Sequence, residues 1–295
     1  MKRIFNLGSI NIDHVYQVPH FVRPGETLAS GGYAKGAGGK GFNQSVALAR
    51  AGAAVRHLGT YGAEAAWLRE ALAAEGIDIA GLLPSALPAG HALIQVSDAG
   101  ENAIVLFAGA NHGVTAEFFP SFFEGAAKGD WFLTQNETSS VPEAIGVAAA
   151  LGLTICLNPA PMTEAVKAYP LELVDWLIVN ETEGEELSGE SEPGAMLRRL
   201  RQLCPRAWVV LTLGAEGVLC LTPAGEELRA ASPRVVPVDT TAAGDTFIGY
   251  LLAAAMEGKE PAEALGLACR AAALGVTRRG AFDSIPRRGE LGERA

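Results

Sequence analysis

The stretch Val238–Phe247 combines a turn of small residues with one acid, a pattern that suits chemistry on a phosphate group. Residues 242–244 have almost no side chain, and an apolar helix is expected from about Thr246 to Met256. The first turn of a helix leaves backbone N–H groups unpaired, and the helix dipole favours an anion there. Asp245 falls in that turn, where a carboxylate can accept a proton from a hydroxyl that attacks a bound phosphate. An ordinary first-turn acid would look the same, so the turn alone leaves both interpretations open.

The elements around this turn are expected to form an open sheet covered by helices. Val235, Val236 and Val238 predict a strand that ends at the turn. From Trp131 onward, apolar runs typical of strands and of helices alternate, which predicts a parallel sheet with helices on both faces. The expected elements are Trp131–Leu133, Pro142–Leu151, Leu153–Leu157, Glu164–Ala168, Trp176–Val179, Glu181–Leu187, Ala195–Leu203, Trp208–Leu211 and a last helix over Ala262–Arg278.

Polar clusters follow four of these strands. They are Gln135-Asn136-Glu137, Asn158-Pro159-Ala160-Pro161, Asn180-Glu181-Thr182-Glu183 and Thr212-Leu213-Gly214. Any one of them could be a helix cap. Because parallel strands end at the same edge of a sheet, four together predict a crevice that binds a ligand.

The first predicted strand, Ile4–Leu7, also ends in polar residues. Asn11 and Asp13 follow it closely. Polar side chains at the end of a first strand are typical of ligand sites in α/β sheets. An Asx turn would use the same residues, and both interpretations stand.

The segment Gly31–Gly41 is rich in glycine, and residues 36–41 match the dinucleotide pattern GxGxxG. The context is wrong for a dinucleotide, because the next strand, Val55–Gly59, carries no acid for a ribose. A P-loop is excluded too, since Gly41 replaces the Ser or Thr that binds magnesium. The glycines therefore predict a backbone held close to a small ligand, with Asn43 on the following helix to bind hydroxyls.

A second, smaller sheet is expected from the strand pair His91–Val96 and Ala103–Phe107, which flank a turn at residues 97–100. The extended segment Glu26–Lys35 could join them. Such a sheet could cover the crevice as a lid.

Composition narrows the class of protein. The chain has 295 residues, 49% hydrophobic, and a net charge of −10, which argues against partners such as nucleic acid or anionic membranes. Cys156, Cys204, Cys220 and Cys269 form no CxxC pair and are expected as thiols in the core. No signal peptide precedes the first strand and no apolar run approaches ~20 residues, so a cytoplasmic location is expected.

Eight segments resemble, in order, the motifs of the ribokinase-like (PfkB) carbohydrate kinase family. They are Gly8–Asp13, Pro24–Thr27, Gly38–Gln44, Leu157–Pro161, Asn180–Glu183, Thr212–Gly214, Asp239–Phe247 and Thr277–Ala281. The resemblance spans nearly the whole chain. It implies a three-layer α/β sandwich with a mainly parallel central sheet, helices on both faces and a small β lid. It also implies a single domain over residues 1–295, with the lid at about 14–38 and 91–108.

The resemblance further implies that the chain transfers the γ-phosphoryl group of ATP to a sugar hydroxyl, the 5-OH in the case of ribose. Asp245 would then be the base, which favours catalysis over the ordinary-acid interpretation. The backbone N–H groups of Ala242, Ala243 and Gly244 would form the anion hole. Phosphoryl transfer asks a protein mainly for positioning and charge stabilisation, which these groups can supply.

The family pattern also implies three ligand sets. The sugar would contact Asn11, Asp13, Gly39, Lys40, Asn43, Glu137 and Asp245. ATP with Mg²⁺ would contact Asn180, Glu183, Thr212, Gly214, Gly217, Gly244 and Cys269. A potassium ion would lie near Asp239, Thr241, Gly275, Arg278, Gly280 and Ser284, mostly on backbone carbonyls.

Two residues depart from the family pattern. Cys269 stands where His or Asn is frequent, and Phe42 replaces a small residue, where it could narrow the sugar pocket. The alternatives within the family are a kinase of a nucleoside or of another sugar or sugar acid. A sugar-binding protein without catalysis is disfavoured, because binding alone needs no base. A homodimer through the lid is expected, since the lid strands carry apolar residues that one lid cannot bury.

Overall fold

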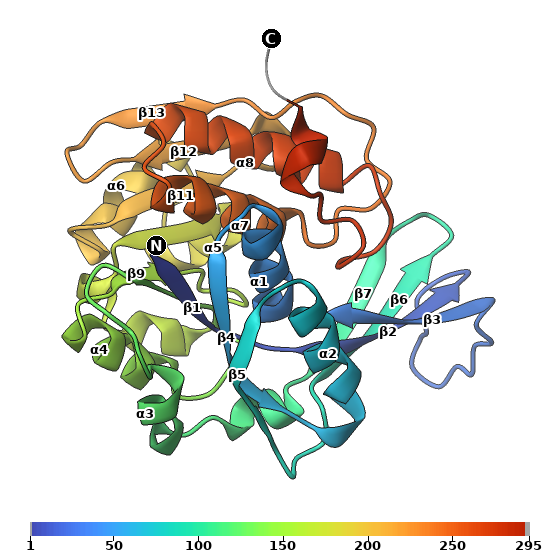
Figure 1. Ribbon diagram of the computed structural model, residues 1–295. Coiled ribbons are helices and arrows are strands. Elements are labelled where there is room, and N and C mark those ends of the chain that lie inside the picture. Colours follow the sequence, from blue (N-terminus) through green and yellow to red (C-terminus); the bar gives the residue numbers. More distant parts are fainter. Residues whose placement is uncertain (1, 293–295) are drawn as a thin grey trace.

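The computed structural model describes residues 2–292, so the two ends of the predicted domain 1–295 lie outside the described residues. Its centre is a nine-stranded sheet in the order β13-β12-β11-β10-β9-β8-β1-β4-β5. The strands from β5 to β11 are parallel, and β12 and β13 pair antiparallel at one edge. The predicted α/β architecture with a mainly parallel sheet is confirmed (Figure 1).

The central parallel strands are short and buried, as strands between two helical layers must be, while the edge strands β5 and β13 are partly exposed. The strands of the sheet are β1 (Arg3–Leu7), β4 (Ala54–Tyr61), β5 (Asp78–Pro84), β8 (Trp131–Thr134), β9 (Thr154–Leu157), β10 (Trp176–Asn180), β11 (Trp208–Thr212), β12 (Val218–Leu221) and β13 (Glu227–Ala230).

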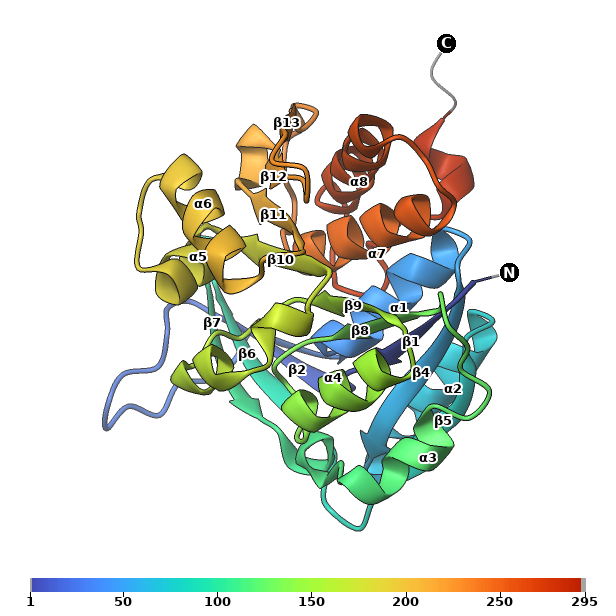
Figure 2. The same ribbon diagram turned by 90° about the vertical axis from the view of Figure 1, so that its left-hand side faces the viewer.

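Helices cover both faces of the sheet (Figure 2). They enclose two separate apolar cores. One face carries α1 (Lys40–Arg50), α2 (Ala66–Ala74), α7 (Ala243–Met256) and α8 (Pro261–Gly275). The other carries α3 (Phe119–Phe122), α4 (Val141–Ala150), α5 (Glu181–Ser188) and α6 (Pro193–Leu203). The predicted helix at residues 164–168 is a 3₁₀ helix. None of the described helices has the length and apolar character that a membrane span requires. All four cysteines are free and buried, as expected.

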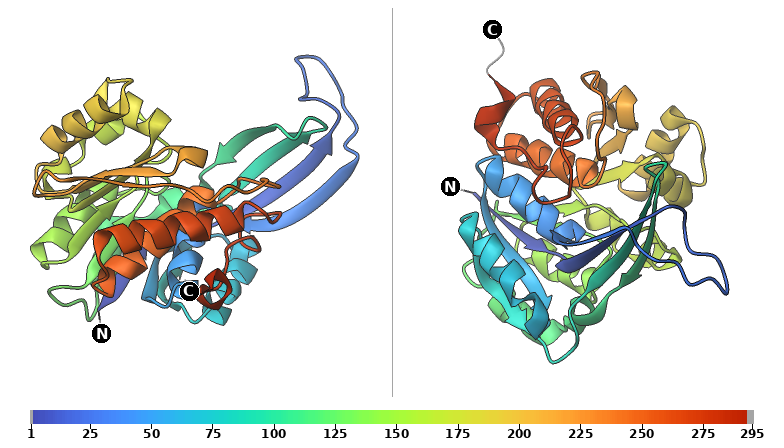
Figure 3. Two further views of the ribbon diagram at one scale, coloured as in Figure 1. Left: turned by 90° about the horizontal axis from the view of Figure 1, so that it is seen from above. Right: turned by 90° about the vertical axis from the view of Figure 1, so that its right-hand side faces the viewer.

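A second sheet of four strands projects from the body (Figure 3). Its order is β3-β2-β6-β7, and its strands are β2 (Asn11–Val18), β3 (Gly32–Gly38), β6 (His91–Ser97) and β7 (Asn102–Phe107). Asn11 and Asp13 belong to β2, opposite Gly38 and Gly36, so the Asx-turn interpretation is wrong. The GxGxxG match falls on β3 and the start of α1, and β3 is a strand of this small sheet.

The strand predicted from Val235, Val236 and Val238 does not exist. Residues 231–242 have no regular structure, and Val236 is 84% exposed. Pro233 and Pro237 explain this, because proline has no N–H for a sheet ladder. The sequence reading also missed β12 and β13, whose short runs between turns resemble the loops around them.

Close packing of α1 against α7 joins the two halves of the chain. Gly249 of α7 lies against the backbone of α1, and a Cβ there would come within 2.8 Å of the Ala47 carbonyl carbon and the Leu48 nitrogen. Gly8 and Gly41 meet in the same way, so the end of β1 touches the first turn of α1. Glycine is required at these points because no larger residue leaves room for the backbones.

We expect Gly249→Ala to lower the free energy of unfolding by about 1–3 kcal/mol, because the added methyl overpacks the α1–α7 contact. Gly146→Ala in α4 is the matched control. Nothing lies near a Cβ at Gly146, so that change should stabilise the helix by about 0.5–1 kcal/mol. Denaturant unfolding of both variants measures the difference, and equal effects would contradict the packing described here.

Candidate active site

The order of the strands fixes where a ligand can bind. From β1 the chain adds β4 and β5 on one side, and β8 to β11 on the other. Open α/β sheets bind ligands at the carboxyl edge beside such a switch point, because the loops there diverge and leave a crevice. Ser9, Gln135 and Glu137 follow β1 and β8 at this edge.

Helix α7 begins at this crevice. Ala242 is its N-cap and has a left-handed backbone (φ 60°), which exposes the first turn. Thr246 N–H makes the first intrahelical bond, to the Ala242 carbonyl at 2.8 Å. Ala243 N–H donates to the Thr240 carbonyl at 3.2 Å, so this predicted member of the anion hole is partly engaged. The N–H groups of Ala242 and Gly244 have no hydrogen-bond partner among the described residues.

Asp245 is held from two sides. Its Oδ1 accepts from Nε2 of Gln44 at 2.9 Å, and its Oδ2 accepts from Nδ2 of Asn43 at 3.0 Å. Burial raises the pKa of the Asp245 carboxyl above its usual value. The nearby Lys40 ammonium and the two amide donors partly oppose this shift. A carboxylate of raised pKa that still has free lone pairs is suited to accept a proton.

Lys40 lies among acids. Burial alone would lower the pKa of Lys40, but the carboxylates of Asp245, Glu137 and Glu183 raise it. The cation therefore balances charge where several acids meet. A cavity of about 200 Å³ opens here, and its lining brings together Lys40, Asn158, Asn180, Glu183, Thr212, Thr240, Ala242, Ala243, Gly244 and Asp245.

Three of the predicted sugar residues, Asn11, Asp13 and Asn43, are outside the lining of this cavity. Burial, followed by the charges of Glu137 and Asp245, raises the pKa of Asp13 to about 7. Its carboxylate lies against the Cα of Gly38, which explains the glycine there. Asn11 is buried, and its Oδ1 accepts from Nδ2 of Asn111 at 2.7 Å.

The side chain of Asn43 has an acceptor that is free to bind a ligand. Its Oδ1 is buried and has no partner among the described residues. A sugar hydroxyl would satisfy it, which fits the predicted role. Glu137 accepts from the backbone N–H of Lys40 at 3.0 Å and from Ser9 Oγ, so its carboxylate ties β8 to the start of α1. Gly39 caps α1 with φ 94°, which favours glycine.

The predicted nucleotide residues are only partly brought together. Asn180, Glu183, Thr212 and Gly244 line the cavity. Gly214 and Gly217 lie in the following turn, outside its lining, and Gly217 packs against the backbone of residues 230–232. Cys269 is buried on α8 beside the carbonyl of Ala230, and burial raises the pKa of its thiol to about 11.

The segments around Asp239 and Gly280 lie side by side, as a shared cation site requires. Asp239 Oδ1 accepts from the N–H and Oγ1 of Thr241 at 2.9 and 2.6 Å, and its Oδ2 accepts from Gly280 N–H at 2.9 Å. Partial burial would raise the pKa of Asp239, but these hydrogen bonds hold it below its usual value.

The other predicted cation residues flank this pair. The carbonyl of Ser284 lies 3.6 Å from where a Cβ on Gly275 would be, and Arg278 N–H donates to the Gly275 carbonyl at 3.0 Å. The Arg278 side chain instead pairs with Glu290. In residues 2–292, no group of three His, Cys, Asp or Glu side chains is placed to hold a metal.

Sequence reasoning missed Gln44, Asn158 and Ser9 as individual site residues, although all three lie in segments that it singled out. The only indication in the sequence was that each of them lies beside a predicted site residue. The sequence left open that Phe42 narrows the sugar pocket, but its side chain lies in the core instead. It is fully buried and packs edge-to-face on Phe282 with ring centroids 5.6 Å apart, in the core.

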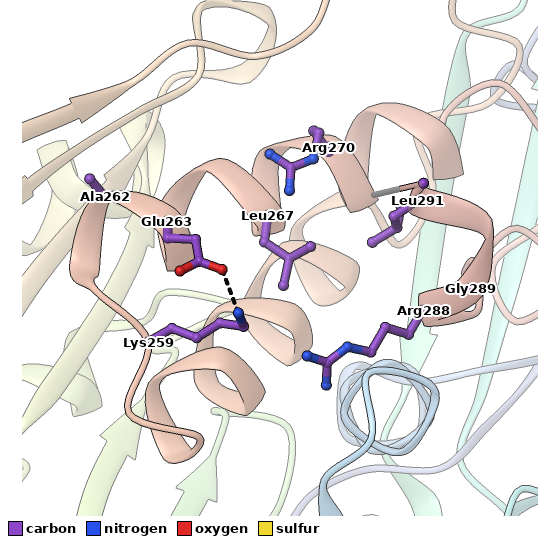
Figure 4. Close-up of a pocket in the computed structure, with 9 residues that line it drawn as sticks. Lys259, Ala262, Glu263, Leu267, Arg270, Arg288, Gly289 and Leu291 are labelled. Atoms are coloured by element: carbon purple, nitrogen blue, oxygen red, sulfur yellow. Dashed lines mark hydrogen bonds and ion pairs between the residues drawn. The ribbon is translucent and has the colours of Figure 1, made fainter. Parts of the chain in front are cut away.

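A larger hollow of about 1150 Å³ lies away from this crevice, on the outer side of α8 (Figure 4). Lys259 and Arg288 point toward it, but Lys259 pairs with Glu263 and Arg288 pairs with Glu257. These two paired charges offer little to a ligand. The smaller cavity has the convergent polar groups expected of an active site.

Comparison with known proteins agrees with this geometry. The profile of the pfkB family carbohydrate kinases matches residues 1–288. A ribokinase of Haemophilus influenzae is 38% identical, covering 98% of this chain and 97% of its own. The structure of a Thermotoga maritima ribokinase is 34% identical with a TM-score of 0.89, covering 99% and 98% of the two chains. An Arabidopsis thaliana ribokinase complexed with ribose and ATP is 26% identical with a TM-score of 0.87, covering 99% and 98%. The chain belongs to the pfkB family of carbohydrate kinases.

Proposed function

We propose that this protein is an ATP-dependent kinase that transfers the γ-phosphoryl group to the 5-hydroxyl of ribose. The observation that carries the proposal is the position of Asp245, whose oriented carboxylate borders the same cavity as the bare first turn of α7. The named relatives support the substrate, because full-length chains up to 38% identical are ribokinases.

In this mechanism the sugar lies beside Asn11, Asp13 and Asn43, with its 5-hydroxyl directed at Asp245. Asp245 accepts the hydroxyl proton as the sugar oxygen forms a bond to the γ-phosphorus. The bond between that phosphorus and the bridging oxygen breaks, and ADP leaves with the electron pair. N–H groups at the start of α7 and the Lys40 ammonium stabilise the negative charge on the transferred group.

Magnesium fits the acidic side of the cavity through its water shell. Both Glu183 oxygens already accept from Asn180, at 3.0 Å each, in a capping box at the start of α5. Such an occupied carboxylate suits outer-sphere contact, which Mg²⁺ tolerates well because it dehydrates reluctantly. When bound, the ion neutralises triphosphate charge. The chain's part is to place Glu183, whose pKa is raised by burial, opposite Lys40.

A potassium ion is proposed between the segments around Asp239 and Gly280. Carbonyl oxygens of Gly275 and Ser284 suit a weakly hydrated monovalent cation, and the Asp239 charge favours any cation. Because Asp239 is only six residues before Asp245, an ordered cation would stiffen the turn that exposes the anion hole. Adenine is proposed to lie near Thr212, Gly214, Gly217 and Cys269.

We propose that two lids pack together in a homodimer. In the register of the small sheet, Leu93 pairs with Val105 and His91 with Phe107, while Asp13 pairs with Ala92. Leu93, Val105 and Phe107 therefore share the face turned away from Asp13. They are 42%, 64% and 47% exposed, which is unusual for large apolar residues unless a partner covers them.

Asp245→Asn should lower turnover by about 10²-fold or more, since it removes the general base while keeping the side chain's shape. The affinities for ATP and ribose should change little. ADP release gives the rate and isothermal titration calorimetry gives the affinities. Glu164→Gln, at an exposed acid that does not line the cavity, is the control. Unchanged turnover in Asp245→Asn would contradict the assignment of Asp245 as the base.

Val105→Glu should convert the dimer to a monomer at micromolar concentration, because it buries a charge in the proposed lid–lid contact. Leu151→Glu, at an exposed apolar residue after α4, should leave the dimer intact. Light scattering measures both masses. A wild-type protein that is already monomeric at micromolar concentration contradicts the proposed dimer.

A further inference from the structure

A chain of buried amides lies beneath Asp245. Gln44 is fully buried and uses every polar group of its side chain. Its Nε2 donates to Asp245 Oδ1 at 2.9 Å and to Asn158 Oδ1 at 3.2 Å, and its Oε1 accepts from Gln135 Nε2 at 2.7 Å. Gln44 is 0% exposed, so it contacts the base but offers no surface to a ligand.

The direction of these hydrogen bonds is fixed. Gln135 Nε2 also donates to Oδ1 of Asn6 at 3.0 Å, so the Gln135 amide is anchored to β1. Because Gln135 donates to Gln44 Oε1, the Gln44 amide cannot flip without bringing two N–H groups together. Its two N–H bonds must then point at Asp245 and Asn158. A buried amide with all partners satisfied is rigid and costly to rearrange.

The chain continues to a second acid. Asn158 Nδ2 donates to the Ile178 carbonyl at 3.0 Å and to Glu183 Oε2 at 3.4 Å. The amides of Gln44 and Asn158 therefore connect the carboxylates of Asp245 and Glu183, both of which line the cavity. Both residues donate N–H groups, and neither adds charge.

We propose that Gln44 is a positioning residue, which fixes the carboxylate of Asp245 for proton transfer and, through Asn158, sets its orientation relative to Glu183. The inference rests on the proposed role of Asp245 as the base. Asn43 also contacts Asp245, but its free Oδ1 marks it for a ligand, so only Gln44 holds the base independently of the sugar.

Neutral amides are the suitable choice at this position. Lys40 from the start of α1, Asp13 from β2 and Glu183 from α5 all act on the charge of Asp245 or respond to it. Another acid at position 44 would add repulsion, and a second cation would draw the carboxylate away from the sugar. An N–H donor orients the oxygen and favours its ionised form without either cost.

Gln44→Met keeps the length of the side chain and removes the donor. We expect kcat to fall about 10- to 100-fold, because a base that is free to rotate is poorly aligned. The KM for ribose should change less than about threefold, since Gln44 touches no ligand. The acidic limb of the kcat profile should move to higher pH, because loss of the Gln44 hydrogen bond raises the pKa of Asp245.

Two further variants separate positioning from general stability. Gln135→Met leaves the Gln44–Asp245 bond possible but removes the anchor of Gln44, so it should give a smaller loss of kcat and a shift of the limb in the same direction. Ser45→Ala disturbs the far end of the same network, where Ser45 Oγ bonds Asn6 and His57. It should lower the melting temperature and leave the acidic limb in place.

A folded Gln44→Met protein with unchanged kcat and an unchanged acidic limb overturns the inference. If Gln44→Met does not fold, Gln135→Met decides by the same two readouts. An acidic limb that moves equally in Ser45→Ala also overturns it, since the effect would then be one of stability. Full activity in Asp245→Asn would instead remove the proposed base, and so failure of the function is distinguished from failure of this inference.

Discussion

The contact between α1 and α7 is the constraint on which the site depends. Gly249 lets α7 press on the backbone of α1, and this brings the two helix starts together at the carboxyl edge of the sheet. The start of α1 supplies Lys40, Asn43 and Gln44, and the start of α7 supplies Asp245 and the bare N–H groups. Residues about 200 positions apart thus share one hydrogen-bonded cluster. The small residues of both helices are needed for this close packing, not for flexibility.

Because the whole chain is acidic, groups inside the crevice must supply the positive charge that a triphosphate needs. With a net charge of −10, the protein has no broad basic field to attract a triphosphate. Two local features can take its place, the start of α7 and the partly buried Lys40, and the proposed metal ions would add to them. Around Lys40, burial raises the pKa values of Asp13, Glu183 and Asp245, and the charge of Asp245 adds to the shift at Asp13 and Glu183. Such perturbed groups in one crevice are typical of a catalytic site.

The sequence predicted those parts of the site that are formed by residues close together along the chain. Turn-forming residues and the spacing of apolar residues were enough to predict the helix start at Asp245, the glycines before α1 and the strand ends. It failed where pairing partners are distant. Asn11 and Asp13 fit a turn as well as a ligand site until β3 pairs with them, and Val235–Val238 looks like a strand although no strand within residues 2–292 pairs with it. Gln44 escaped notice because a buried glutamine has no pattern of its own, and only the fold brings Gln135 and Asn158 to it.

The proposed mechanism has Asp245 activate a ribose hydroxyl beside an anion hole that potassium would stiffen. The most direct test is ADP release from Mg-ATP with ribose, deoxyribose, fructose, adenosine or pseudouridine, each with and without potassium. We predict turnover with ribose that potassium stimulates, and little turnover with the two nucleosides. Turnover with a nucleoside alone would contradict the sugar assignment, and no turnover with any acceptor would contradict the kinase mechanism itself.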